Sequence, residues 1–346
     1  MELKKIVSLI FAIFLSGNVL LSAQKIYVSP LGNDFNPGSA DKPLATLNAA
    51  VLKAREMRNA GESAQPFEII VSGGEYFMMQ PLVLTAEDSG TEKSPLVIRG
   101  EQGEKAILRG GVPVEGWEEV NPNLWRSFIP QVAYNNLYFE QLYVNGERAV
   151  RARTPNEGFS RVRKVDETVL EKGTGRAPEL AVQKIGLDPA DARFIETFTG
   201  EDFRDALIIF SHNWDNTRKR ITGFSRDSSS VYTVGEGMKP WNPVNAKSRY
   251  LIENFRQALD APGEWFLERS GYLYYIPREG ETQANTTFHI PVLREFVVLR
   301  GEAGEAGKVE NIRFENLAFE VAGYLTPSEG NEPAQAAAPV DAVITA

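Results

Sequence analysis

The sequence predicts an all-β fold, namely a right-handed parallel β-helix that carries an N-terminal capping helix and an inserted β-rich hairpin domain. Short segments rich in β-branched residues recur between turn residues at 67–71, 82–84, 96–98 and 106–108, and most are followed closely by glycine. A solenoid gives this pattern because each coil contributes brief strands with turns at its corners. A β-sandwich, which also has short strands, is the alternative architecture.

The first 23 residues have the pattern of a secretory signal peptide. Lys4 and Lys5 carry positive charge, a largely apolar run extends from Ile6 to Leu21, and Ala23 is the small residue that signal peptidase needs. We expect cleavage after Ala23, export to the periplasm or the extracellular space, and no membrane contact afterwards. An uncleaved membrane anchor is the alternative, but the apolar run is short and small polar residues interrupt it.

The composition indicates a folded globular chain and narrows the choice of partner. The chain has 346 residues, of which 42% are hydrophobic and 24% are charged, and it has no cysteine. A large buried core must therefore replace disulfides in an exported protein. The net charge of -9, without a run of Lys or Arg, argues against nucleic acid. A polysaccharide or oligosaccharide is compatible with this balance, no cofactor is indicated, and the oligomeric state stays open.

A helix over residues 44–58 is expected to cap the open end of the solenoid. Pro43 suits its first turn, and Asn59-Ala60-Gly61 would stop it. The apolar residues that share one face at helical spacing are Leu44, Leu47, Val51 and Ala54. Because a β-helix leaves a hydrophobic end uncovered, this stripe would pack there.

The chain divides into four segments by pattern. After the signal peptide, residues 24–112 are expected to form the cap and the first coils. An aromatic-rich stretch then begins, and residues 113–291 are expected to form the inserted β-rich domain. Residues 292–346 would form the resumed coils.

Two hairpins are expected inside the inserted domain. Asn145-Gly146 lies between two short strand patterns, which is a strong signal for a two-residue hairpin. A second turn at 269–271 would join the segments 264–267 and 272–276. Both segments are rich in aromatic residues, as strands commonly are.

The coil pattern resumes at 296–299 and 312–319, with Asn311 and Asn316 at expected turns. A last strand would begin at Asp341. A solenoid that ends on a new strand leaves an unpaired edge. We therefore expect the chain to be a truncated form of a longer protein.

Several motifs support a family resemblance. Ile26–Pro30 followed by Gly32-Asn33-Asp34 is similar to the N-terminus of many exported bacterial right-handed β-helix carbohydrate enzymes. The segments 142–156 (LYVNGERAVRARTPN), 260–267 (DAPGEWFL) and 271–277 (GYLYYIP) resemble the insertion of glycoside hydrolase family 141. The resemblance implies a glycoside hydrolase that acts on plant cell-wall polysaccharide, either xylan or fucose-containing pectin. It also implies that the catalytic acids lie on later coils, so this chain would lack them and be inactive.

No catalytic residue can be assigned from the sequence. Glycoside hydrolysis usually needs two carboxyl groups that face each other across the scissile bond. Glu320 and Asp341 are the carboxylates nearest the resumed coils. We interpret both as solvated corner residues, because most acidic side chains are exposed.

A candidate substrate-binding group lies in segment 211–218, on a predicted strand. His212, Trp214 and Arg218 combine an aromatic ring with polar groups, as sugar sites commonly do. The interpretation that we favour is structural, with Trp214 packed in the core and Asp215 paired with Arg218.

Two further groups have both a ligand-binding and a structural interpretation. Arg148, Arg151 and Arg153 could bind acidic pectin, but structural ion pairs are the favoured interpretation. Residues 33–36 include oxygen donors, yet turn formation explains them and their spacing is not that of a calcium loop. The sequence therefore indicates no metal site.

Two other functions stay open. A β-helix polysaccharide lyase uses the same scaffold, and its unsaturated products absorb in the ultraviolet. A non-catalytic glycan-binding surface protein would bind saccharide without turnover.

Overall fold

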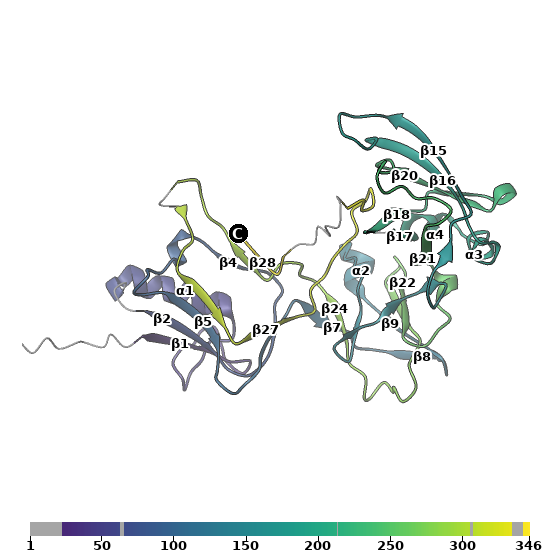
Figure 1. The fold of residues 1–346 in the computed structure, drawn as a ribbon. Helices are drawn as coiled ribbons and strands as arrows, with labels where there is room; N and C mark the ends of the chain where they lie inside the picture. The colour runs from purple at the N-terminus through teal and green to yellow at the C-terminus, as the bar shows by residue number, and fades with distance from the viewer. Residues whose placement is uncertain (1–22, 63–65, 213, 305–306, 334–341) are drawn as a thin grey trace, which may run out of the picture. The chain divides into compact units, whose positions relative to one another are not determined.

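The computed structural model describes residues 23–62, 66–212, 214–304, 307–333 and 342–346 (Figure 1). The chain forms two compact units. The first contains residues up to 74 with 85–105 and 301–316, and the second contains 75–84, 106–300 and 317–346. Within the described ranges, no helix is long and apolar enough to cross a membrane. The expected signal peptide lies almost wholly outside the described residues.

The first unit contains a parallel sheet of four strands. They are, in spatial order, β1 (Gln24–Val28), β2 (Phe67–Val71), β5 (Leu96–Gly100) and β26 (Ile312–Glu315). Ile26, Ile69 and Ile98 are register partners on neighbouring strands, and all three are buried. Placing equal side chains at equal register positions lets each strand bury the same face as its neighbour.

Helix α1 (Leu47–Met57) packs its apolar face against β1 and β2. The predicted start at Leu44 is wrong, because Leu44 stays extended and forms a parallel bridge with Val28. Thr46 caps the helix instead, and its side-chain oxygen accepts the N–H of Ala49 at 3.1 Å. A π-helical turn (Arg58–Glu62) and a 3₁₀ turn (Ala86–Asp88) also belong to this unit.

Two small sheets in the second unit continue the repeating pattern. One has the order β27 (Leu317–Glu320), β6 (Ala106–Arg109), β3 (Gly74–Phe77), and the other has the order β28 (Ile344–Thr345), β25 (Val297–Leu299), β4 (Leu82–Leu84). Three times along the sequence, the chain adds one strand to each of these three parallel-strand sheets, in the same order. The three sets of strands are β2-β3-β4, β5-β6-β25 and β26-β27-β28. This connectivity is that expected of successive coils.

Asn316 forms the expected turn between β26 and β27. Its backbone is left-handed, with φ of 51°, and its Nδ2 donates to the carbonyl oxygen of Glu101 at 2.9 Å. Asn311, with φ of 55°, precedes β26 in the same way. Asparagine tolerates this conformation and bonds the neighbouring backbone, so both predicted turns are confirmed.

Antiparallel strands and short helices make up most of the second unit. Four further sheets belong to this unit. The first two, in spatial order, are β11 (Glu147–Arg148), β10 (Tyr143–Val144), β24 (Phe288–Pro291), β7 (Gly111–Pro113); and β12 (Val150–Arg151), β22 (Glu264–Leu267), β23 (Tyr272–Tyr275), β9 (Leu124–Phe128), β8 (Glu118–Asn121). The other two are β13 (Arg153–Thr154), β21 (Arg249–Glu253), β17 (Leu207–Ser211), β18 (Asn216–Arg220), with β14 (Ser160–Arg161) on β21; and β15 (Lys164–Glu171), β16 (Leu180–Gly186), β20 (Ser230–Gly235), β19 (Gly223–Ser225). The helices are α2 (Pro130–Asn135), α3 (Pro189–Ile195) and α4 (Gly200–Asp205), with 3₁₀ turns at Arg226–Ser228 and Arg256–Ala258. The all-β prediction is confirmed.

Both predicted hairpins are present. Asn145 and Gly146 have φ of 52° and 82° and join β10 to β11 in a two-residue turn. Strands β22 and β23 pair in antiparallel fashion, with Trp265 opposite Tyr275. Because two-residue turns of this type need positive φ at both positions, Asn-Gly was a reliable signal.

The inserted segment has a narrow neck. Strand β7 pairs antiparallel with β24. Just outside them, the carbonyl oxygen of Gly110 accepts the N–H groups of Val292 and Leu293, each at 2.8 Å. The segment therefore begins and ends at one place, between β6 and β25.

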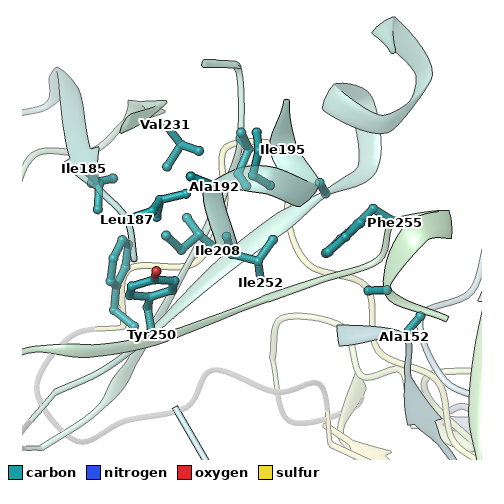
Figure 2. Packing of buried hydrophobic residues seen from close by; sticks show 14 of the residues in the cluster. Ala152, Ile185, Leu187, Ala192, Ile195, Ile208, Val231, Tyr250, Ile252 and Phe255 are labelled. Carbon is teal, nitrogen blue, oxygen red and sulfur yellow. The ribbon is translucent and has the colours of Figure 1, made fainter. Parts of the chain in front are cut away.

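Two apolar clusters form the core of the second unit. One gathers residues from β17, β20, β21 and α3, including Ile208, Val231, Ile252 and Ile195 (Figure 2). Tyr250 lies within it, fully buried, and its hydroxyl donates to Asp191 Oδ2 at 2.7 Å. The other cluster is aromatic and lies around Trp125, Phe139, Trp265, Tyr275 and Phe288.

Candidate functional site

The second unit contains a cleft of about 840 Å³. Its lining comes from strands β3, β6, β7 and β24, the loop between β7 and β8, the β10–β11 turn and the loop before β24. The lining residues whose charged, amide or aromatic side chains could contact a ligand include Glu75, Arg109, Glu115, Trp117, Gln283 and His289. We call this site the Trp117 cleft.

Three charged side chains lie in a row across the sheet of β27, β6 and β3, beside the cleft. Arg109 Nη2 lies 2.7 Å from Glu75 Oε1 and 3.4 Å from Glu320 Oε2. The fold positions them because Glu320 and Arg109 are register partners on β27 and β6, while Glu75 lies on β3, the other neighbour of β6. Arg109 is nearly buried, whereas both carboxylates are partly exposed. One guanidinium thus holds two carboxylates close together.

His289 lies on β24 and is 7% exposed. The ring of Phe77 stacks on it with the ring centroids 6.2 Å apart, and its Nδ1 has no hydrogen-bond partner among the described residues. Burial lowers the pKa of His289, and the positive charge of Arg109 lowers it further. The imidazole is therefore neutral at neutral pH.

Trp117 forms an aromatic wall of the cleft. Its Nε1 donates to the carbonyl oxygen of Val114 at 3.2 Å, and its ring packs on Phe288 with centroids 4.1 Å apart. The indole is half-buried, so its orientation is held while part of the ring lines the cleft. An indole face with nearby carboxylates, an amide and a neutral imidazole can bind the apolar face and the hydroxyls of a sugar.

The structure places His212, Trp214 and Arg218 elsewhere, and not on one strand. His212 and Asp215 close the turn between β17 and β18, where the N–H of His212 donates to the carbonyl oxygen of Asp215. Trp214 is 54% exposed, so the expectation that it packs in the core is wrong. Arg218 lies 3.7 Å from Glu253, so the expected pair with Asp215 is also wrong. The turn is the physical reason, because it points these side chains in different directions.

Asp215 instead belongs to a buried charge cluster. Lys239 Nζ lies 3.6 Å from Asp215 Oδ2 and 3.5 Å from Glu332 Oε1, and Lys219 Nζ lies 3.7 Å from Glu332 Oε2. All four side chains are at most 7% exposed. Burial raises the pKa of Glu332 and lowers the pKa of Lys219. Two cations and two anions balance one another here, which is how buried charges are tolerated.

Thr217 links this cluster to His212. Its hydroxyl donates to Glu332 Oε1 at 3.0 Å and lies 3.0 Å from His212 Nε2. Because the one hydroxyl hydrogen points to Glu332, Nε2 must carry the hydrogen and donate to Thr217. Burial lowers the pKa of His212, which agrees with this neutral tautomer. Thr217 is fully buried, so the group is a structural network and not an open site.

Glu332 comes from a segment after β27 that we call the strap, residues 321–333. Thr326 donates its N–H and its hydroxyl to Glu140 Oε2 at 3.0 and 2.7 Å. Gln141 exchanges two hydrogen bonds with the backbone of Tyr324. The strap is therefore held along its length by side chains of the inserted region.

The arginines favour the structural interpretation. Arg151 is buried, with its Nη1 3.6 Å from Glu253 and 3.8 Å from Glu140. Arg153 donates to the carbonyl oxygens of Pro155 and Gly158. Arg148 is exposed in the β11 strand. They do not form a common basic surface.

The structure gives different outcomes for the remaining candidate ligand-binding and acidic residues. The expected turn is present, since Asn33 Oδ1 accepts the N–H of Phe35 at 2.9 Å, whereas Asp34 Oδ1 accepts the more distant N–H groups of Ala45 and Thr46. Glu320 is not a solvated corner residue, since it ends β27 and pairs with Arg109. Asp341 lies outside the described residues. Within the described ranges, no group of three or more His, Asp or Glu side chains could hold a metal ion.

Comparisons with known proteins identify the inserted region. Residues 122–278 match the GH141 insertion domain. A solved structure described as "Glycoside hydrolase" superposes on 90% of the chain with a TM-score of 0.72 and 30% sequence identity. The chain is GH141-like. The matched range includes both predicted hairpins and most of the aromatic core cluster, but not Phe288.

A second relative of the GH141-like chain is "Pectate lyase PEL9" from Emericella nidulans, which is 32% identical over 146 residues, or 40% of this chain. The chain spans about half the length of the solved glycoside hydrolase, at 53%, and about a third of the pectate lyase, at 33%.

The Trp117 cleft was not predicted from the sequence. Glu75 and Arg109 end up beside His289 although they are distant from it along the chain. One signal was present, since Arg109 and Glu320 both end a strand of the repeating pattern. Aligning the coils by their strand ends would have paired these two residues.

Proposed function

We propose that this GH141-like chain contributes to an exported β-helix glycoside hydrolase that acts on plant cell-wall polysaccharide, and that the Trp117 cleft binds part of the sugar chain. The observation that carries the proposal is the 30% identical glycoside hydrolase structure, which 90% of the chain matches. The repeated strand order supports the β-helix architecture. Export rests on the N-terminal pattern of Lys4 to Ala23.

The charge of the cleft favours a neutral sugar over a uronate. Glu75 and Glu115 line it and Glu320 is adjacent, whereas Arg109 supplies the one positive charge among these residues and is already paired twice. An acidic sugar would meet uncompensated negative charge and no free guanidinium from this group. A neutral polysaccharide such as xylan, or the neutral side chains of pectin, fits better.

Glu75 and Glu320 serve binding and not proton transfer in this proposal. A glycosidase needs one carboxyl group that donates a proton to the leaving oxygen. Both Glu75 and Glu320 are instead held by the Arg109 guanidinium, at 2.7 and 3.4 Å. The catalytic carboxyl groups are therefore proposed to be other residues than Glu75 and Glu320.

The test measures binding and turnover separately. The recombinant chain is titrated calorimetrically with neutral xylo-oligosaccharides and with oligogalacturonate, beside a Trp117→Ala variant. We expect the neutral ligand to bind, oligogalacturonate not to bind, and Trp117→Ala to lose the tight component. Equal binding of both ligands, or no effect of Trp117→Ala, would refute the assignment of the cleft.

The pectate lyase match supports one alternative, a polysaccharide lyase. A lyase would release unsaturated products that absorb in the ultraviolet, whereas a hydrolase releases reducing ends without that absorbance. Incubating the chain with polygalacturonate and with xylan distinguishes the two chemistries. Saccharide binding without either product would favour a non-catalytic glycan-binding protein.

A further inference from the structure

A second pocket lies between helix α4 and the loop that joins β22 to β23. Its volume is about 290 Å³. Its lining includes Asp205, Asn254, Arg256, Phe266, Arg269 and Ser270. None of them lines the Trp117 cleft. We call this site the Asn254 pocket.

Asn254 has an unsatisfied acceptor. The residue is 1% exposed, and its backbone is left-handed, with φ of 68°. Its Nδ2 donates to Tyr138 Oη at 3.0 Å and to the carbonyl oxygen of Asp205 at 2.9 Å. Its Oδ1 is buried and has no hydrogen-bond partner among the described residues.

The orientation of this amide is determined by its neighbours. Exchanging Oδ1 and Nδ2 would turn an acceptor toward the carbonyl oxygen of Asp205, which is itself only an acceptor. The unpaired atom is therefore the oxygen. A buried acceptor without a donor is unfavourable, so a ligand that supplies a hydroxyl would be stabilised here.

The other walls exclude strongly charged ligands. Asp205 is occupied by Arg269, whose Nε and Nη2 donate to its two oxygens at 2.8 and 2.5 Å. Arg256 stacks on Tyr274 with its Cζ 4.1 Å from the ring centroid. The guanidinium groups disfavour a cation, and Glu201, Asp202 and Glu268 on the rim disfavour an anion.

These features together describe a site for a neutral sugar. The pocket is lined by Asn254 with its unpaired acceptor, by the guanidinium groups of Arg256 and Arg269, and by the apolar ring of Phe266. A sugar ring offers hydroxyl donors, hydroxyl acceptors and an apolar C–H face. The volume is at the low end for ligand pockets, so it suits one ring and not a chain.

We propose that the Asn254 pocket is a second saccharide site, which holds one neutral sugar ring with a hydroxyl donating to Asn254 Oδ1. It takes the same class of ligand as the Trp117 cleft and in that respect rests on the proposed function. Binding at a second site would anchor a polysaccharide on the inserted region.

The test uses two variants that separate the sites. Ser270→Trp fills the Asn254 pocket from its exposed loop, and Trp117→Ala removes the aromatic wall of the cleft. Ser228→Trp, an exposed residue that lines a different pocket, is the matched control. Binding of reduced xylo-oligosaccharides is followed by calorimetry and by saturation-transfer NMR.

We expect saccharide binding to persist in Trp117→Ala and to weaken about tenfold when Ser270→Trp is added, with Ser228→Trp unchanged. Loss of all binding in Trp117→Ala alone would overturn the second site and leave the cleft assignment intact. Binding in the double variant equal to that in Trp117→Ala would overturn it as well. If saccharide binds neither the wild type nor any variant, both assignments fail.

A second variant covers the case in which Ser270→Trp does not fold. Asn254→Gly keeps the left-handed backbone, which glycine adopts readily, and removes the acceptor. Combined with Trp117→Ala, it should weaken the remaining binding about tenfold. Unchanged affinity in a folded Asn254→Gly protein would overturn the role of Oδ1.

Discussion

Glu320 and Arg109 are register partners on the parallel strands β27 and β6, and their side chains form an ion pair of 3.4 Å. Arg109 also pairs with Glu75 on the other side of its strand. Residues far apart in sequence thus meet because neighbouring parallel strands place them at the same register position. The row of alternating charge is a direct product of the strand order β27-β6-β3.

Replacing Arg109 should destabilise the fold more than a surface ion pair would. Arg109→Met leaves Glu75 and Glu320 near each other without a cation, so we expect a loss of about 1–3 kcal/mol of unfolding free energy at neutral pH. Urea denaturation measures it. Arg99→Met, which breaks the more exposed pair with Glu68, should cost less than about 1 kcal/mol. Equal losses would contradict a special role for the shared guanidinium.

The strap should depend on its buried carboxylate. Glu332→Gln leaves Lys219 and Lys239 with one acidic partner, so we expect a loss of about 3 kcal/mol and faster hydrogen exchange in residues 321–333. Glu329→Gln, on the exposed side of the strap, is the control and should change neither quantity. Similar exchange in both variants would show that backbone contacts, and not the charge cluster, hold the strap.

Glu264 should make the protein less stable as pH rises. Burial raises the pKa of Glu264 to about 7 from 4.5, although two N–H groups bond its Oε2. The folded state therefore binds this proton more tightly than the unfolded state. The contribution is complete below about pH 4.5 and is lost as pH rises through about 7, by no more than about 3 kcal/mol.

The measurement is the urea midpoint at several pH values across this range. Glu264→Gln should flatten the dependence and raise the stability relative to wild type above pH 7. An unchanged slope in this variant would assign the pH dependence to other groups.

Two nearby glycines should differ in their tolerance of alanine. A Cβ at Gly100 would lie 2.1 Å from the carbonyl oxygen of Asn316, so Gly100→Ala must separate β5 from the backbone of Asn316. We expect a cost of about 3 kcal/mol or more. Gly103 has φ of 85° and open space around it. Gly103→Ala should therefore cost about 1 kcal/mol of unfolding free energy, from backbone conformation alone. Thermal denaturation compares them, and equal costs would contradict close stacking at Gly100.

Local patterns predicted local structure well. Asn145-Gly146 and the positive-φ asparagines were recognisable because turn geometry depends on the residues in the turn. The predicted start of α1 was wrong, because Leu44 has helical spacing in the sequence but forms a β-bridge with Val28 in the structure. The strand expected through His212 and Trp214 failed because β17 turns there into β18.

The candidate site was less predictable than the fold. Its residues come from β3, β6 and β24 and from loops between them, so no single window of sequence contains the cleft. Exposure of Trp214 and burial of Arg151 are both contrary to the average behaviour of their residue types. Contacts between distant parts of the chain decide whether such a side chain is exposed or buried, and a single sequence does not show these contacts.

The neck formed by Gly110, Val292 and Leu293 has an evolutionary consequence. Because the inserted segment leaves and rejoins the chain at neighbouring positions, a gene could acquire, exchange or lose it without moving β6 or β25. The parallel sheets would keep their pairing while the insertion diversified independently. Proteins of different specificity could then descend from one scaffold by replacing what is attached at this junction.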